Sequence, residues 1–242
     1  MKKIFLILSL IILASCSSDD DNSVVIPDNV DGTLIKKAVY TNNSGQISTT
    51  EYTYSGNKLL KIESNSGSST SYEYAGNLIT KINFNFGSLT TESQWLTYDN
   101  NKLISMKKTI LGDITYSVTY TDNADNSVTI KDYNGDFENG GTLVSESKAF
   151  VENGSVVKME KYHSGGTLTY NYTYDDKFTP TAGITGYDKL RFYQVGATAN
   201  AHNILSVTGA ANVEMHYTYN AQNFASTVEE GTDGPTVKYY YY

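Results

Sequence analysis

The stretch Tyr52-Thr53-Tyr54-Ser55-Gly56-Asn57-Lys58-Leu59-Leu60-Lys61-Ile62 decides the fold, because the chain repeats it. The segment from Tyr72 to Ile82 aligns with it without a gap, and the segment from Leu96 to Met106 is a third copy. In each copy, alternate residues on the first strand share a face, a turn pair rich in Gly and Asn reverses the chain, and aliphatic residues two apart line the returning strand. Each copy therefore predicts a β-hairpin.

Weaker copies begin at Val118, Ala149 and Tyr217, so the pattern continues along the chain. Alternation is clean over 114–120, 168–174 and 213–219, where one face is aromatic and aliphatic and the other carries Thr, Asn, Glu and Lys. We expect residues 34–242 to form a single all-β domain, an antiparallel meander of tandem hairpins that curls or closes like a barrel to bury its apolar face.

The alternation also assigns individual side chains to the two faces. Tyr54 and Tyr74 should be equivalent core residues, while Thr53 and Glu73 should point outward. One region, residues 175–212, lacks the Tyr-x-Tyr spacing, and we predict an irregular excursion from the meander there, with a helical turn between Thr181 and Leu190.

The N-terminus has the pattern of an exported lipoprotein. Lys2 and Lys3 precede a short apolar run from Ile4 to Leu13, which is too short for a transmembrane helix of ~20 residues, so we interpret residues 1–15 as a signal peptide. The segment Leu13-Ala14-Ser15-Cys16 resembles a lipobox, which implies cleavage between Ser15 and Cys16 and lipidation of Cys16.

Residues 16–33 are expected to be an acidic, flexible tether beyond the lipidated cysteine. The run Ser17-Ser18-Asp19-Asp20-Asp21-Asn22 is too polar to pack, and it resembles the acidic export tag of surface lipoproteins of Bacteroidetes. The resemblance implies a surface-exposed outer-membrane lipoprotein whose durable membrane partner is the lipid on Cys16.

The charge of the chain argues against one class of partner. The formal net charge is −8, and removal of the segment with Lys2 and Lys3 makes it more negative by two. Nucleic-acid binding depends largely on clustered cations that neutralise phosphates, so we expect no nucleic-acid partner.

The repeat unit itself resembles a known one. Its Tyr-x-Tyr, turn, Leu-x-x-Ile pattern is similar to the YD repeat of RHS-type proteins, and Tyr98-Asp99 carries the pair that gives the repeat its name. The stretch from Tyr172 to Pro180, followed by 183–187 and 203–206, resembles an uncharacterised family of Bacteroidetes surface lipoproteins with such repeats. This resemblance covers most of residues 34–242; it implies a β fold at the cell surface and no particular activity.

Catalytic patterns are scarce in the sequence. His163, His202 and His216 lack metal spacing, and the chain contains no Gly-x-Ser-x-Gly elbow, phosphate loop or dinucleotide fingerprint, so we do not expect an enzyme. One segment could hold calcium, because oxygen-bearing side chains alternate in it; its candidate ligands are Asp132, Asn134, Asp136 and Glu138. A plain acidic hairpin loop is the alternative.

Three functions fit these observations. The first is a non-enzymatic surface module that binds or interacts with another molecule. The second is a carbohydrate-binding lipoprotein that uses its 21 tyrosines to stack on sugar rings. The third, least favoured by the short alternating segments, is a porin-like outer-membrane barrel. A glycan or a protein would be the ligand of the first two.

Overall fold

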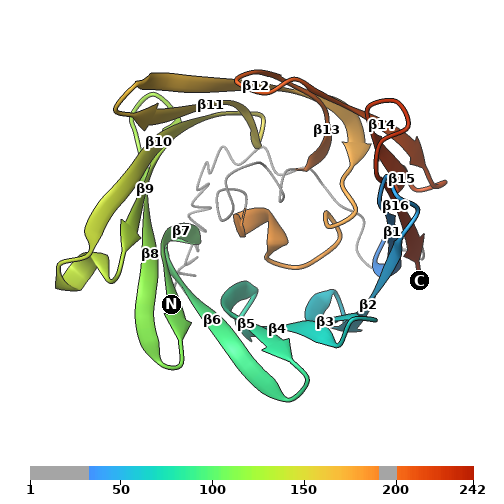
Figure 1. The fold of residues 1–242 in the computed structure, drawn as a ribbon, viewed down its shortest axis with the longest axis horizontal. Helices are drawn as coiled ribbons and strands as arrows, with labels where there is room; N and C mark the ends of the chain where they lie inside the picture. Colours follow the sequence, from blue (N-terminus) through green and yellow to red (C-terminus); the bar gives the residue numbers. More distant parts are fainter. Residues whose placement is uncertain (1–32, 191–200) are drawn as a thin grey trace, which may run out of the picture.

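The protein is a closed antiparallel barrel, described by a computed structural model for residues 33–190 and 201–242 (Figure 1). Two 3-10 helices, η1 (Phe137–Asn139) and η2 (Tyr187–Leu190), interrupt the strands. The strands of the described residues are β1 (Ile35–Thr41), β2 (Ile47–Ser55), β3 (Lys58–Ser64), β4 (Ser68–Ala75), β5 (Leu78–Phe86), β6 (Leu89–Asp99), β7 (Lys102–Ile110), β8 (Asp113–Asp122), β9 (Ser127–Asn134), β10 (Thr142–Glu152), β11 (Ser155–His163), β12 (Gly166–Phe178), β13 (His202–Gly209), β14 (Val213–Tyr219), β15 (Ala225–Glu230) and β16 (Thr236–Tyr241).

The sheet is a meander that closes on itself. Each of the sixteen strands pairs with its neighbours in sequence, and β1 pairs with β16, with Ala38 opposite Tyr239. The all-β meander predicted from the repeats is confirmed, and it takes the barrel form. Closure removes the free sheet edges that an open meander of this length would expose.

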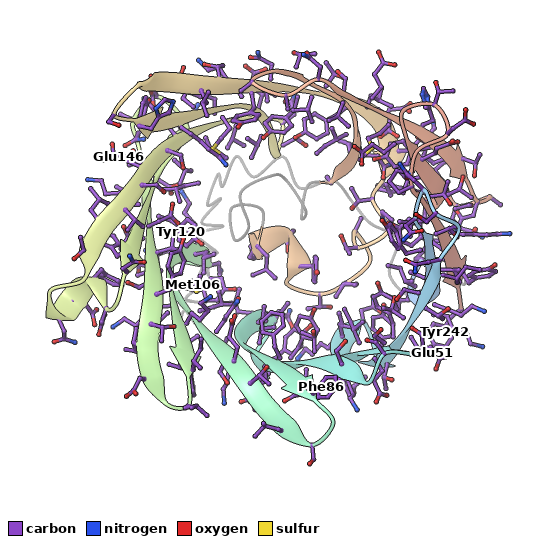
Figure 2. The ribbon with its side chains drawn as sticks, viewed as in Figure 1. Glu51, Phe86, Met106, Tyr120, Glu146 and Tyr242 are labelled. Atoms are coloured by element: carbon purple, nitrogen blue, oxygen red, sulfur yellow. The ribbon has the colours of Figure 1, made fainter. Side chains whose placement is uncertain are left out.

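The two faces of the wall follow the predicted alternation. Tyr54 and Tyr74 are half-buried on the inner face, and the intervening Glu73 is exposed on the outer face. Figure 2 shows Met106 and Tyr120 on the inner side of the wall and Glu146 on the outer side. The predicted faces of these first-strand residues are thus confirmed for the two strongest repeats.

The return strands differ from the prediction at one point, because each contains a β-bulge. Strict alternation would place Leu60 and Ile62 on one face; instead Leu59 and Ile62 face inward, and Leu60 is 40% exposed. The register shifts there because Thr53 pairs with Lys61 while Tyr54 pairs with Leu59. The same shift occurs in the pairs β4–β5, β6–β7, β10–β11 and β14–β15. The Leu-x-x-Ile spacing is therefore the sequence signature of a bulge, which bends and twists the strand.

Tyrosine side chains bond to the backbone at these bulges. The Tyr98 hydroxyl donates to the carbonyl oxygen of Ile79 on the preceding strand, at 2.8 Å. Two later repeats show the same contact: Tyr174 donates to Val156 at 2.6 Å, and Tyr241 donates to Ala225 at 2.6 Å. In each case the acceptor is the inward residue of the bulge. The tyrosine near the end of the strand next to the bulge thus has a structural task at these three places.

The core lies against the inner wall from β5 to β11. It includes the buried side chains of Ile79, Ile82, Met106, Ile130 and Met159, with tyrosines packed against it. Sixteen strands enclose an interior too wide for wall side chains alone to fill, as in barrels of porin size. Apart from the buried Tyr120, the lining tyrosines accordingly remain only half-buried.

The excursion is shorter than predicted. Strand β12 continues to Phe178 and β13 runs from His202 to Gly209, so residues 175–178 and 202–209 of the predicted excursion belong to strands. Its described part enters the interior, where η2 lies inside the ring of strands (Figure 1). The predicted helical turn is confirmed as this 3-10 helix, and Leu190 joins the core.

Backbone contacts hold the excursion against hairpin turns at one end of the barrel. Thr185 N donates to Asn57 O at 2.9 Å, and Phe178 N donates to Asn223 O at 3.0 Å. At Gly186, where φ is +75°, a Cβ atom would lie 2.4 Å from Asn77 O. Glycine is required there both by the backbone angle and by the close approach to that turn.

Candidate ligand-binding site in the barrel lumen

A band of polar side chains crosses the inner wall on the side of the core away from the excursion. We call Glu92, Gln94, Lys108, Tyr116, Asp132 and Ser145 the lumenal polar band. Gln94, Lys108 and Tyr116 are directly opposite one another on β6, β7 and β8. Asp132 pairs with Val118 on one side and with Ser145 on the other. The register of five consecutive strands therefore brings these side chains together.

The members of the band are linked by contacts. Gln94 Nε2 donates to Glu92 Oε1 at 2.5 Å, and the Lys108 Nζ atom lies 3.4 Å from Glu92 Oε2. Lys108 Nζ also lies 5.6 Å from the centre of the Tyr116 ring. These contacts hold the lysine between a carboxylate and an aromatic face.

Asp132 is the most buried carboxylate of the band, at 8% exposure. It accepts hydrogen bonds from the Tyr116 hydroxyl, at 2.5 Å, and from the Ser145 hydroxyl. The pKa of Tyr116 is raised, mainly by burial and further by the hydrogen bond to Asp132, so the phenol stays a proton donor well above neutral pH. The band thus presents a fixed carboxylate with its donors in place.

Two of the buried polar atoms that have no hydrogen-bond partner in the described part of the chain lie in or beside the lumenal polar band. They are Gln94 Oε1 and the hydroxyl of Ser147, whose residues are 8% and 3% exposed. Ser147 follows Ser145 on the same face of β10 and lies opposite Ile130. Buried polar atoms are usually satisfied, so these two mark a place where the interior is incomplete without a further polar group.

The four predicted calcium ligands are not brought together. Asp132 bonds inside the lumen, whereas Asp136 and Glu138 both contact the Lys107 Nζ atom, at 2.8 and 2.5 Å. Asn134 is the last residue of β9, and Gly135, with φ of +80°, then turns the chain. Over residues 33–190 and 201–242, no group of three or more His, Cys, Asp or Glu side chains is placed to hold a metal ion. A calcium effect at this loop stays a prediction.

The remaining predicted residues are separated or lie outside the described part. His216 is opposite Glu229 on β14 and β15, and His202 Nδ1 contacts Lys177 O at 3.0 Å. His163 Nδ1 accepts from Gly165 N at 3.0 Å. Ser15 and Cys16, the predicted cleavage and lipidation residues, fall outside the described residues.

The outer face of the barrel is mostly polar. Ion pairs connect neighbouring strands on it, including Lys81 with Glu73 at 3.3 Å and Lys131 with Glu146 at 3.4 Å. Thr218 and Thr227 share a hydroxyl contact of 2.7 Å between β14 and β15. Within the described residues, no helix has the length and hydropathy needed to span a bilayer.

Sequence reasoning missed the polar band although a signal for it was present. Gln94 precedes Leu96 by two positions, so the two share a face, and a large polar residue stands on the face that Leu96 turns inward. The same holds for Asp132, two positions after Ile130. The alternation alone therefore indicates that these polar side chains point inward. Which of them lie opposite one another depends on the register between strands, which the sequence does not show.

These features define a class: a closed, sixteen-stranded meander barrel with an aromatic interior and a polar exterior. Among solved structures, the fold is similar to the crystal structure of a porin-like protein from Bacteroides uniformis ATCC 8492, with a TM-score of 0.57 and 10% sequence identity. The similarity covers 89% of this chain and 98% of that one. No family model and no curated protein matches the sequence.

Proposed function

We propose that the protein is a lipid-anchored, outer-membrane-associated module that binds a ligand in its barrel lumen, without enzymatic activity. The distribution of side chains on the two faces carries this proposal. The inner face offers tyrosines and a lumenal polar band, whereas the outer face offers paired ions. A ligand site with aromatic walls and a few convergent polar groups is the usual form of a small-molecule pocket.

Two further observations support the membrane location. The lipobox pattern at Leu13-Ala14-Ser15-Cys16 supplies an anchor by lipid, and the structural neighbour is named porin-like. The resemblance to YD-repeat lipoproteins of the cell surface agrees with this location. The same proposal places the barrel on the outer surface of the cell.

A porin-like channel is the second candidate, favoured by the closed sixteen-stranded barrel. A membrane-spanning barrel needs an apolar outward band about 25 Å tall, and charged side chains on a lipid-facing wall cost about 2–4 kcal/mol each at the bilayer centre. Lys81, Lys131 and Glu146 lie on the outward face. The ion pairs therefore favour a barrel wall in contact with water.

Detergent phase separation with the full chain distinguishes the two candidates. The wild type should partition into the detergent phase, and Cys16→Ala should move to the aqueous phase, because only the lipid would hold the protein in detergent. Partition of Cys16→Ala into detergent would show that the wall itself contacts lipid, and the channel would then be the better proposal. Ser18→Ala is the control variant and should behave like the wild type.

A further inference from the structure

The unpartnered atoms of the inner wall indicate what kind of group is missing. Gln94 Oε1 can only accept a hydrogen bond, whereas the Ser147 hydroxyl can donate or accept. Both residues are more than nine-tenths buried and face the interior from β6 and β10, on either side of Lys108, Tyr116 and Asp132. A ligand that satisfies both atoms must offer a donor and must span more than one strand.

The charges of the band restrict the ligand further. Glu92 and Asp132 are carboxylates and Lys108 is the one cation of the band, so the wall has an excess of negative charge. An anionic ligand such as a phosphate or sulfate ester would face both carboxylates at short range, which opposes its binding. A cationic ligand would be repelled by Lys108, which lies between the two carboxylates in the order of the strands. A neutral ligand avoids both conflicts.

Aromatic rings complete the chemistry of this wall. Tyr116 and Phe84 are partly buried and pack against the core. Tyr116 belongs to the band, and Phe84 lies on β5 directly opposite Glu92 of the band. Aromatic faces next to carboxylate and amide oxygens can contact the C–H surface of a ring while the oxygens bind its hydroxyls. A ligand hydroxyl can donate to Gln94 Oε1, and another can donate to or accept from the Ser147 hydroxyl.

We propose that the lumenal polar band, together with Ser147, is a binding site for a neutral polyhydroxylated ligand of the chemical class of sugars. This assignment rests on the proposed function and names the ligand class that the lumen takes. Gln94 Oε1 accepts a ligand hydroxyl, Ser147 contacts a second one, and Asp132 accepts a third beside its bonds from Tyr116 and Ser145. Tyr116 and Phe84 provide the apolar contact.

The test is a glycan array that carries neutral and sulfated oligosaccharides, probed with the full chain in which Cys16 is replaced by Ala. The strongest neutral glycan is then titrated calorimetrically against Gln94→Met and Ser147→Ala. Loss of one hydrogen bond between uncharged groups should weaken binding about tenfold for Gln94→Met. Thr97→Ala, a change on the outer face of the same strand, is the matched control and should stay within about twofold.

A stability readout separates a ligand contact from a structural one. Ser147→Ala removes a buried, unpartnered hydroxyl, so the ligand-free variant should melt at the same temperature as the wild type or about 2–4 °C higher. Gln94→Met also removes the hydrogen bond from Gln94 Nε2 to Glu92, so it is compared by binding alone. A residue with a purely structural role would lower the melting temperature. Weaker glycan binding with equal or greater stability is thus the expected result.

Three results would overturn the assignment: binding to no neutral glycan, preference for sulfated glycans, or equal affinity of Gln94→Met, Ser147→Ala and wild type. Each is distinguishable from failure of the proposed function. If Cys16→Ala remains in the aqueous phase and no neutral glycan binds, the water-facing barrel stands and only the ligand class is wrong. If Cys16→Ala enters detergent, the proposed function itself fails.

Discussion

At the scale of single residues, tyrosine has different tasks at equivalent positions of the repeat. The hydroxyl of Tyr98 satisfies the Ile79 carbonyl oxygen at a bulge, whereas the hydroxyl of Tyr54 is buried without a partner. Both rings face the interior. The aromatic ring is therefore the shared requirement of the repeat, and the hydroxyl is useful only where the neighbouring strand presents an acceptor.

Tyr98→Phe is expected to cost about 1–2 kcal/mol of unfolding free energy, because the buried Ile79 oxygen loses its donor. Tyr174→Phe should lose a similar amount, since its hydroxyl bonds to Val156 O in the same way. Tyr54→Phe is the matched control, and it should be neutral or slightly stabilising. Urea unfolding measures all three; equal losses for Tyr98→Phe and Tyr54→Phe would contradict the bulge contact.

Leu111 is strained as well as exposed. Its φ is +52°, in the turn between β7 and β8, and its side chain is 88% exposed. Left-handed backbone disfavours leucine and is tolerated by asparagine, which is common in such two-residue hairpin turns. We expect Leu111→Asn to raise the unfolding free energy by about 0.5–1 kcal/mol. Leu143→Asn, at an exposed strand residue without a positive φ, should change it by less than about 0.5 kcal/mol, and a gain of the same size there would refute the strain argument.

At the scale of elements, the hairpins could be predicted and the bulges could not. The turn chemistry of Gly56-Asn57 and Gly76-Asn77 and the Tyr-x-Tyr alternation identify the strand pairs. A bulge adds one residue without changing the composition of the strand, so Leu59-Leu60-Lys61-Ile62 is compatible with two registers. The structure selects the one in which Leu60 points outward, because Tyr54 pairs with Leu59.

The docking of the excursion allows a direct test with two glycines. Gly186→Ala should weaken it, because the added Cβ would meet Asn77 O at 2.4 Å in addition to the strain at positive φ. Gly231→Ala carries only the strain, since φ is +63° and nothing lies within 4 Å. Hydrogen exchange at the Thr185 amide, which bonds to Asn57 O, should accelerate strongly in Gly186→Ala alone. Equal protection of that amide in both variants would show that the excursion does not depend on this contact.

At the scale of the whole molecule, closure and the polar band depend on long-range register that local sequence does not encode. The pairing of β1 with β16 joins residues at opposite ends of the described chain, such as Thr41 and Thr236. The band likewise depends on Gln94, Lys108 and Tyr116 meeting across three strands. No short motif contains these residues together, so the sequence predicts a curled or barrel-like meander but neither its closure nor its site.

The tyrosine-lined interior makes the whole barrel sensitive to alkaline pH. Burial raises the pKa of twelve tyrosines on the inner side, among them Tyr74 and Tyr217, each to about 12. The others are Tyr52, Tyr54, Tyr98, Tyr116, Tyr172, Tyr174, Tyr187, Tyr219, Tyr239 and Tyr241. Above pH 10 the unfolded chain loses these protons while the folded barrel keeps them, so the free energy of unfolding falls as the pH rises.

The expected result is cooperative unfolding within one to two pH units above about pH 10. Each tyrosine contributes at most about 1.4 kcal/mol per pH unit, and half-exposed rings contribute less, yet the sum is comparable to a typical folding free energy of about 5–15 kcal/mol. Phenolate absorbance and far-ultraviolet circular dichroism should therefore change together. The Tyr54→Phe, Tyr74→Phe double variant should move the transition to higher pH, because two of the responsible groups are gone. The prediction is contradicted if phenolate forms gradually around pH 10 while the dichroism spectrum stays intact. The lumenal tyrosines would then be open to water, and the barrel would stay folded after they lose their protons.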